Sequence, residues 1–153
     1  MTLNLIIRQA IAADAHAVEV LYRQLVNNHA VSVLSDRITQ VNQDPNTALL
    51  VCEYEGIVIG TALVSLCADV MFQAQPFAVI ENIVIESSFR NSGIGSALMK
   101  EIEDFCYRAD CSKIMLLSSS DRIQAHMFFE HVGFIGSSKR GFVKYRSQFN
   151  IAE

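Results

Sequence analysis

The stretch IVIESSFRNSGIGSAL, residues 83–98, decides the fold. It begins as an apolar, β-branched run, continues through polar residues and ends in helix-favouring ones, so it predicts a buried strand, a loop and a helix. Gly93 and Gly95 stand where the loop meets the helix. Glycine lets backbone N–H groups approach a ligand, and the N–H groups and dipole of a helix N-terminus attract phosphate. The stretch therefore indicates a pyrophosphate site, although two glycines are also compatible with a simple tight loop.

Two other phosphate-binding loops are excluded by the residues that follow. A dinucleotide-binding fingerprint needs a third glycine where Leu98 stands, and a Walker loop needs Gly-Lys-Ser/Thr where this chain has Gly95, Ser96 and Ala97. Neither dinucleotide binding of that kind nor nucleotide hydrolysis is expected.

Working outward from this stretch, apolar residues at spacings of three and four predict helices, and apolar or alternating runs predict strands. Glu55-Gly56 marks a hairpin between two of the strands, and Asp14 is the expected N-cap of the first helix. The predicted strands cover residues 3–7, 48–54, 57–68, 77–85 and 113–117, and the predicted helices cover residues 12–26, 35–41, 96–109 and 123–131. One or two closing strands are expected over residues 134–145. This order predicts an α/β fold of mixed type.

Length and composition favour one folded domain over residues 1–153. The chain has a mass of 17.0 kDa, 51% hydrophobic and 18% charged residues, which excludes intrinsic disorder. No apolar stretch is long enough to span a bilayer and no secretory signal is readable, so we expect a cytoplasmic protein that binds no membrane. The net charge of −4 argues against nucleic acid as a partner.

Cysteine and histidine spacings predict no metal site. The cysteines, Cys52, Cys67, Cys106 and Cys111, match neither a C-x-x-C pair nor a zinc ribbon, so we expect reduced core thiols. The histidines form no H-x-x-x-H pair.

Two motifs together resemble a known family. Arg90, Gly93 and Gly95 follow the pattern R/Q-x-x-G-x-G/A, and AHMFFEHVGF, residues 125–134, is similar to A-h-x-F-Y-x-x-x-G-F. Both are features of the GNAT superfamily of acyl-CoA-dependent N-acetyltransferases, which the chain resembles over most of its length. Residues 79–85 and 111–117 look similar to the small aminosugar-phosphate and aminophosphonate acetyltransferases.

The resemblance implies a fold, a co-substrate and a set of binding residues. The fold is a central, mostly antiparallel twisted sheet with a splayed central strand pair, flanked by helices. Acetyl-CoA is the implied co-substrate, with no metal. Its pantetheine arm would follow the strand, and loop amides would hold its pyrophosphate. The implied cofactor-binding residues are Ile83, Val84, Ile85, Arg90, Asn91, Ser92, Gly93, Ile94, Gly95 and Ser96. Phe128 is expected either in the core or against the pantetheine.

Glu81 is the candidate catalytic base for transfer of an acetyl group to a primary amine of a small molecule. Direct attack on the thioester needs a neutral amine, and a positioned carboxylate can remove the proton directly or through water. Glu81 lies in an otherwise apolar strand, where burial would raise its pKa. Relatives often have an acid there. The alternative is an exposed or salt-bridged strand residue. Asn82 stands where some relatives carry a second acid and would bind substrate.

Phe129 departs from the family pattern, because many relatives have a tyrosine there that protonates the leaving thiolate. Phe129 has no proton to donate, so His126 or water would take that role. The rival hypotheses are a CoA-binding module without turnover and a protein or peptide N-acetyltransferase. A homodimer is expected, because relatives pair through their closing strands and the chain end is rich in apolar residues.

Overall fold

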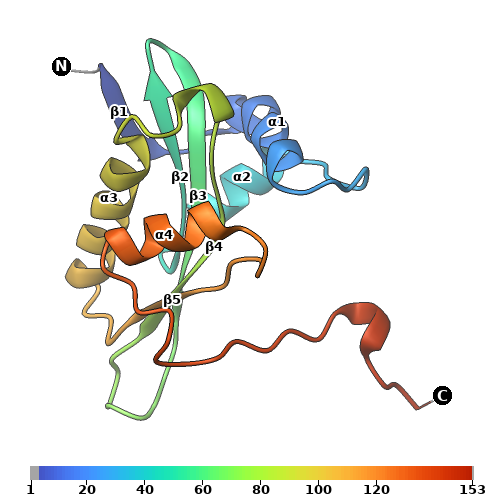
Figure 1. Cartoon of the computed structure of the whole chain (residues 1–153), viewed down its shortest axis with the longest axis vertical. Coiled ribbons are helices and arrows are strands. Elements are labelled where there is room, and N and C mark those ends of the chain that lie inside the picture. The colour runs from blue at the N-terminus through green and yellow to red at the C-terminus, as the bar shows by residue number, and fades with distance from the viewer. Residues whose placement is uncertain (1–3, 153) are drawn as a thin grey trace. The chain divides into compact units, whose positions relative to one another are not determined.

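A five-stranded sheet forms the centre of the first part of the chain (Figure 1). The computed structural model describes residues 4–152, and the strands lie in the order β1-β2-β3-β4-β5. The first four pair antiparallel, whereas β5 runs parallel to β4. The strands are β1 (Leu5–Gln9), β2 (Thr47–Tyr54), β3 (Ile57–Cys67), β4 (Phe77–Ile85) and β5 (Ile114–Leu116). The predicted mixed, mostly antiparallel sheet is confirmed. Leu3, the first residue of the predicted first strand, lies outside the described residues.

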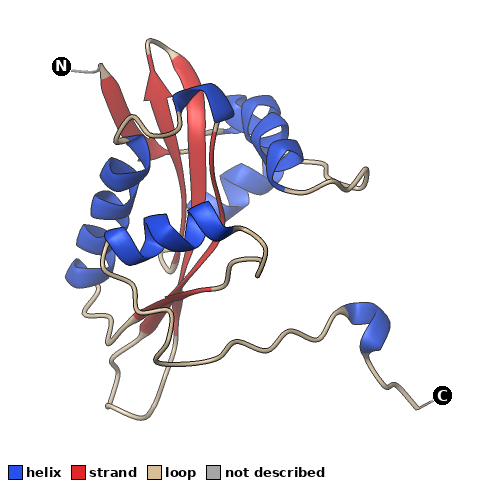
Figure 2. Ribbon diagram, in the orientation of Figure 1, coloured by secondary structure: helices blue, strands red, loops and turns tan. Residues whose placement is uncertain are grey.

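Helices cover both faces of this sheet (Figure 2). α1 (Ala15–Leu25) contacts mainly β3 and β4, and α2 (Ser35–Asn42) contacts β2, while α3 (Ile94–Arg108) lies on the opposite face. The buried side chains of α3 recur every three or four residues, as its sequence predicts; they are Ile94, Leu98, Met99, Ile102 and Cys106. This helix begins two residues before the predicted start.

The hairpin between β2 and β3 turns at Glu55 and Gly56. Both residues have positive φ, +50° and +78°, as a two-residue hairpin turn of type I′ requires. Register pairs Tyr54 with Ile57 directly across the turn. The turn therefore sets the register at this end of the hairpin, and an extra residue of β3, Ile59, shifts it between Glu53 and Cys52.

A bulge interrupts β4 beside β3. Thr61 pairs with Val84, but Leu63 pairs with Glu81, so Asn82 and Ile83 together lie opposite one residue of β3. Asn82 has φ +55°, a left-handed conformation that asparagine tolerates better than most residues. The extra residue shifts the alternation of β4, so the two polar residues Glu81 and Asn82 are both exposed.

The second compact unit, from residue 117 onward, contains α4 (Ile123–His131) and a short 3-10 turn. Its described residues, up to 152, form no strand, so the closing strands predicted over residues 134–145 are wrong. The alternating apolar residues of that segment lie at the surface instead, and Phe142 is 86% exposed. A period-two pattern forms a strand only where a partner strand supplies the hydrogen bonds. The homodimer expected through these strands stays a prediction.

The cysteines are free thiols. Cys52 and Cys106 are buried, and burial raises the pKa of each thiol to about 12. Cys67 and Cys111 are half-buried, so the expectation of core thiols holds fully for two of the four. Among the described residues, no helix is both long and apolar enough to cross a membrane.

A partly buried ion pair joins β1 to the start of α1. Arg8 donates to both Asp14 carboxylate oxygens, at 2.8 and 3.1 Å, and to Glu53 of β2 at 2.8 Å. Asp14 stands at the N-cap position, as predicted, but its carboxylate caps no helix N–H and accepts the Ile11 N–H at 2.7 Å. The hydrogen bond from Arg8 is the main cause that lowers the pKa of Asp14.

We predict that Asp14→Asn lowers the free energy of unfolding by about 1–2 kcal/mol at pH 7, because it removes the charge from a partly screened, hydrogen-bonded pair. The native pKa of Asp14 is depressed, so its contribution exists above the unfolded pKa of about 3.9 and is lost as the pH falls through the native value. Urea unfolding of both proteins between pH 7 and pH 3 measures this. The difference should shrink towards low pH, and a constant difference would contradict the prediction. Asp36→Asn, at an exposed position on α2, is the matched control.

Candidate active site

The end of β4 is an open strand edge. The ladder between β4 and β5 stops at Ile80 opposite Leu116, and in the described part of the chain no strand continues it along residues 81–85. Ile83 and Ile85 are half-buried there and Val84 is buried. Because the ladder stops, the backbone groups on this side of β4 are available to a ligand that extends along the strand.

The loop after β4 is held by three local contacts. Arg90 Nε donates to the Ile85 carbonyl oxygen at 3.0 Å, which folds the arginine side chain back onto the end of the strand. The rings of Phe89 and Tyr54 meet edge to face, with centroids 5.6 Å apart. Glu86 accepts the Ser88 N–H at 2.8 Å, and hydrogen bonds from Ser88 lower the pKa of Glu86. Contacts within the chain itself therefore hold the loop in its conformation.

The loop ends in an uncapped helix N-terminus. Asn91 and Gly93 have φ of +60° and +85°, and Gly93 is the N-cap of α3. Gly93 has no side chain to cap the helix, so the first N–H groups of α3, beginning at Ile94, lack an acceptor from their own helix. No acidic residue occupies the first turn. Asn91, Ser92, Gly93 and Ser96 are exposed, and Gly95 is half-buried. Such an N-terminus fits an anionic group.

Glu81 lies on β4 opposite Leu63, at the first position beyond the β5 ladder. It is exposed, so the predicted burial is wrong. Glu81 is exposed because β5 ends before it and the bulge follows it, so the apolar neighbours in sequence do not enclose its carboxylate. Glu81 nevertheless lies beside the open edge of β4, which is the position that the hypothesis of a catalytic base requires.

Sequence reasoning missed that Tyr22 and Asn82 lie near each other. Tyr22, on α1, is half-buried against the core cluster, and the side chain of Asn82 in the β4 bulge lies near its hydroxyl. Burial raises the pKa of Tyr22, and the neighbouring Asn82 side chain partly offsets the rise. An asparagine inside an apolar strand was the available signal, because asparagine is enriched at positive φ.

The predicted residues of the later motif lie in the second unit. Phe129 is buried in an aromatic cluster, with ring centroids 5.5 Å from Phe128 and 6.0 Å from Phe134. Phe128 is half-buried. His126 Nε2 lies 2.8 Å from the Ser119 carbonyl oxygen, to which it can only donate. That nitrogen is thus engaged within its own unit. The structure brings Glu81, the β4 edge and the loop together in the first unit, and it does not place Phe128 among them.

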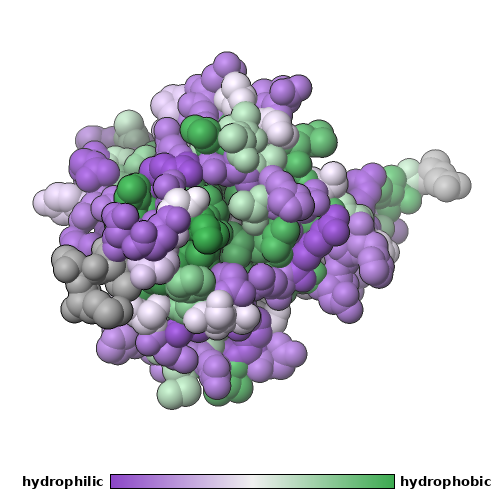
Figure 3. Space-filling view, turned by 90° about the horizontal axis from the view of Figure 1, so that it is seen from above, coloured by the Kyte–Doolittle hydropathy of each residue, from purple (hydrophilic) through white to green (hydrophobic). Residues whose placement is uncertain are grey.

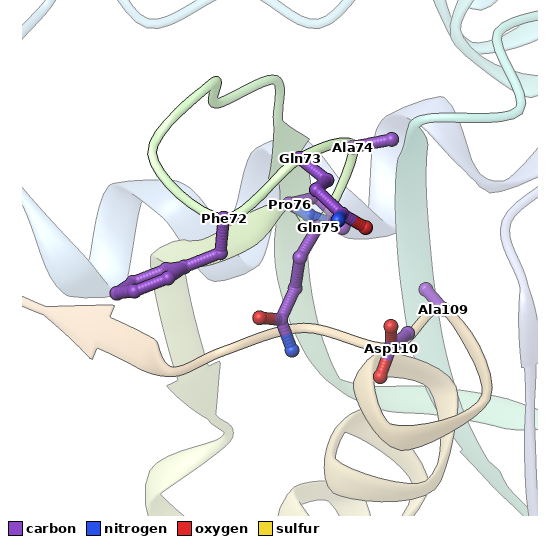
Figure 4. Close-up of a pocket in the computed structure, with 7 residues that line it drawn as sticks. All are labelled: Phe72, Gln73, Ala74, Gln75, Pro76, Ala109 and Asp110. Atoms are coloured by element: carbon purple, nitrogen blue, oxygen red, sulfur yellow. The ribbon is translucent and has the colours of Figure 1, made fainter.

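A polar hollow of about 370 Å³ lies at the other end of α3 (Figure 4). The residues that line it are Phe72, Gln73, Ala74, Gln75, Pro76, Ala109 and Asp110. A helix of 15 residues is about 22 Å long, so this hollow is remote from Gly93 at the N-terminus. Hydrophobic as well as hydrophilic side chains reach the molecular surface (Figure 3).

The sheet is mostly antiparallel, and its fourth strand leads through a glycine loop into an uncapped helix, as the resemblance to the N-acetyltransferases implies. The model of the acetyltransferase (GNAT) family matches residues 15–134, a range that includes residues of both units. The chain belongs to this family.

Similar proteins of known sequence include acetyltransferases with different acceptors. An aminoglycoside N(6′)-acetyltransferase of Stenotrophomonas maltophilia is 27% identical over 130 residues, which cover 84% of each chain. The N-acetylaspartate synthetase of Xenopus tropicalis is 24% identical over 73% of this chain, but the match spans only 41% of that relative. A Bacillus subtilis protein, YdhI, is 33% identical over 54 residues, which make up 34% of its length.

Solved structures support the same fold. The glucosamine-6-phosphate N-acetyltransferase of Arabidopsis thaliana superposes with a TM-score of 0.79 at 22% identity, over 94% of this chain and 99% of that one. An aminoglycoside N-acetyltransferase in complex with CoA gives 0.79 at 20% identity, over 95% and 97%. At these identities the likeness establishes the fold.

We predict different effects on stability for alanine at the two loop glycines. Gly93→Ala should lower the free energy of unfolding by about 1 kcal/mol, because its φ of +85° strains any residue with a Cβ, although no atom lies within 4 Å of the added carbon. Gly95→Ala should be neutral or stabilising, because Gly95 lies in the first turn of α3 and alanine favours helix. Urea unfolding of both variants measures this. Equal stability of the two variants would contradict the assigned loop conformation.

Proposed function

We propose that this chain is an acetyl-CoA-dependent N-acetyltransferase that acetylates the primary amine of a small molecule by direct attack on the thioester. The observation that carries the proposal is the continuous segment in which the open edge of β4 leads through Gly93 to the uncapped start of α3. Family membership and the CoA complex of a structural neighbour support acetyl-CoA as the co-substrate.

Each part of this segment would bind one part of the co-substrate. The backbone of Ile83, Val84 and Ile85 would pair with the amide groups of the pantetheine arm, as an added strand pairs with a sheet edge. The N–H groups from Asn91 to Ser96 would hold the pyrophosphate, with the dipole of α3 adding a favourable potential. Arg90 would act mainly by fixing the loop, because its Nε already donates to Ile85.

Glu81 would serve as the base. The amine nitrogen attacks the thioester carbonyl carbon, the C–S bond breaks, and the electron pair leaves with the CoA sulfur. The proton that the ammonium loses before attack goes to the Glu81 carboxylate, directly or through a water molecule. The second proton, which the nitrogen loses as the amide forms, passes through water to the thiolate. The exposure of Glu81 favours the route through water.

The thiolate would leave without a protein acid. Phe129 has no proton to donate, and the Nε2 proton of His126 is donated to Ser119. A free thiol has a pKa of about 8.5, so a thiolate is a tolerable leaving group near neutral pH, and water can protonate it afterwards.

We predict that Glu81→Gln slows the chemical step by about 10²- to 10⁴-fold while acetyl-CoA still binds, because positioned proton transfer contributes about that much. The measurement is CoA release, detected by its free thiol, with a panel of aminosugar phosphates, aminophosphonates, aminoglycosides, polyamines and peptides. Glu103→Gln, at an exposed position on α3, is the matched control and should leave the rate unchanged.

A loss of less than about threefold in Glu81→Gln would reject Glu81 as the base, because that is far below the effect of a positioned base. Release of CoA with peptides alone would replace the small-molecule acceptor by a protein. If the chain binds acetyl-CoA tightly but releases no CoA with any amine, its function is that of a CoA-binding module without turnover.

A further inference from the structure

Glu81 lies on the face of the sheet that carries α1 and α2. Leu63 of β3 packs against the buried cluster under these two helices, and its cross-strand partner is Glu81. Side chains of paired residues lie on the same face of a sheet, and every second residue of a strand shares that face. Phe77 and Val79 therefore lie on the same face as Glu81, and no bulge separates them from it.

Apolar side chains continue from Glu81 along this face toward the start of β4. Met115 of β5 pairs with Val79, so it lies on the same face. Phe77, Val79 and Met115, here called the apolar strip, are half-buried, so part of each side chain is exposed. The cluster under α1 and α2 includes Leu63 but, among the described residues, none of the strip. The strip is therefore an apolar surface next to the candidate base.

Lys113 adds a positive charge at the far end of the apolar strip. Its carbonyl oxygen accepts the Ala78 N–H at 2.9 Å, which holds its backbone as a continuation of β5. Its Nζ lies 5.5 Å from the centre of the Phe77 ring, so the ring orients the ammonium. Lys113 is exposed, and none of the ion pairs within residues 4–152 involves it. Its ammonium is thus available to an anion.

The spacing of the two charged groups restricts the ligands that can reach both. Glu81 and Phe77 are four positions apart on β4, which is about 13 Å at roughly 3.3 Å per residue. The surface between them is apolar except for Ser65, the cross-strand partner of Val79. A polyhydroxylated acceptor would lose hydrogen bonds to water here and find few partners to replace them. An apolar chain with a charged group at each end fits this surface better.

We propose that the acceptor is an amine with an apolar chain and a terminal anionic group, bound along the apolar strip with its amine at Glu81 and its anionic end at Lys113. This inference rests on the proposed N-acetyltransferase function and deepens it by naming the class of acceptor. The strip holds the chain by removing apolar surface from water, and Lys113 fixes the direction in which the molecule lies. A molecule held at its far end presents its nitrogen at one place, which favours attack on the thioester.

The test compares acceptors that share one chain length and differ at the far end: octylamine is neutral, ω-aminooctanoate negative and octamethylenediamine positive. Glucosamine 6-phosphate is the polar comparator. Lys113→Met keeps an unbranched side chain over Phe77 without the charge, and Lys113→Glu reverses the charge. Lys100→Met, at an exposed position on α3 and so on the opposite side of the sheet, is the matched control. The melting temperature of each variant reports whether it has folded.

We expect the wild-type kcat/KM for ω-aminooctanoate to exceed that for octylamine by roughly two- to fivefold, the effect of one exposed ion pair. Per amino group, octamethylenediamine should be slower than octylamine, and glucosamine 6-phosphate should be slower as well. Lys113→Met should remove the preference for ω-aminooctanoate and leave octylamine unchanged. Lys113→Glu should make octamethylenediamine a better substrate than ω-aminooctanoate, because the repelled end group is now the anion. Lys100→Met should match the wild type.

Several results would overturn the inference while the proposed function stands. These are equal kcat/KM values for ω-aminooctanoate and octylamine in the wild type, an unchanged preference in Lys113→Met, and a higher kcat/KM for glucosamine 6-phosphate than for octylamine. Release of CoA with other amines but with none of these acceptors would have the same meaning. Failure of the wild-type chain to release CoA with any amine is a different result, and it would overturn the proposed function and this inference together.

Discussion

The early end of the parallel ladder between β4 and β5 is the constraint on which the candidate site depends. Pairing stops at Ile80 and Leu116, so within residues 4–152 the second half of β4 pairs with a strand on the β3 side only. Directly after this point the β4 bulge exposes Glu81 and Asn82, and the strand then leads into the glycine loop. A β5 that continued along β4 would satisfy the same backbone groups internally and leave no edge for an extended ligand.

Local dipoles explain how an acidic chain can hold an anion. The net charge is −4, so the field of the whole protein does not attract phosphate. At the start of α3, however, the glycine N-cap leaves N–H groups uncapped, and no carboxylate in the first turn competes for them. The helix macrodipole acts only within about one turn, so its effect is confined to the loop. Binding would therefore depend on the geometry of the loop rather than on total charge.

Much of this arrangement is predictable from the sequence, because it depends on local chemistry. Three elements each have a short-range cause. Turn conformation explains the hairpin at Glu55-Gly56 and the glycine loop before α3, and hydrophobic periodicity explains the apolar run of β4. The burial of Glu81 was predicted wrongly, because the exposure of this side chain depends on where β5 ends. The residues near Glu81 in the sequence do not indicate that end point. The closing strands were predicted wrongly because alternation in residues 134–145 says nothing about a partner strand. Tyr22 and Asn82 are sixty positions apart in the sequence, and their proximity follows from how α1 packs on β4.

The central claim is that backbone N–H groups at the start of α3 hold the pyrophosphate of acetyl-CoA. Calorimetric titration of wild-type and Gly95→Val chains with acetyl-CoA and with acetyl-pantetheine, which lacks the pyrophosphate, tests this most directly. A bulky residue at Gly95 should weaken acetyl-CoA binding by about tenfold or more, a loss of about 1.4 kcal/mol, because it blocks approach to the N–H groups. Binding of acetyl-pantetheine should stay the same in both chains. Equal affinities of the two chains for acetyl-CoA would contradict the account.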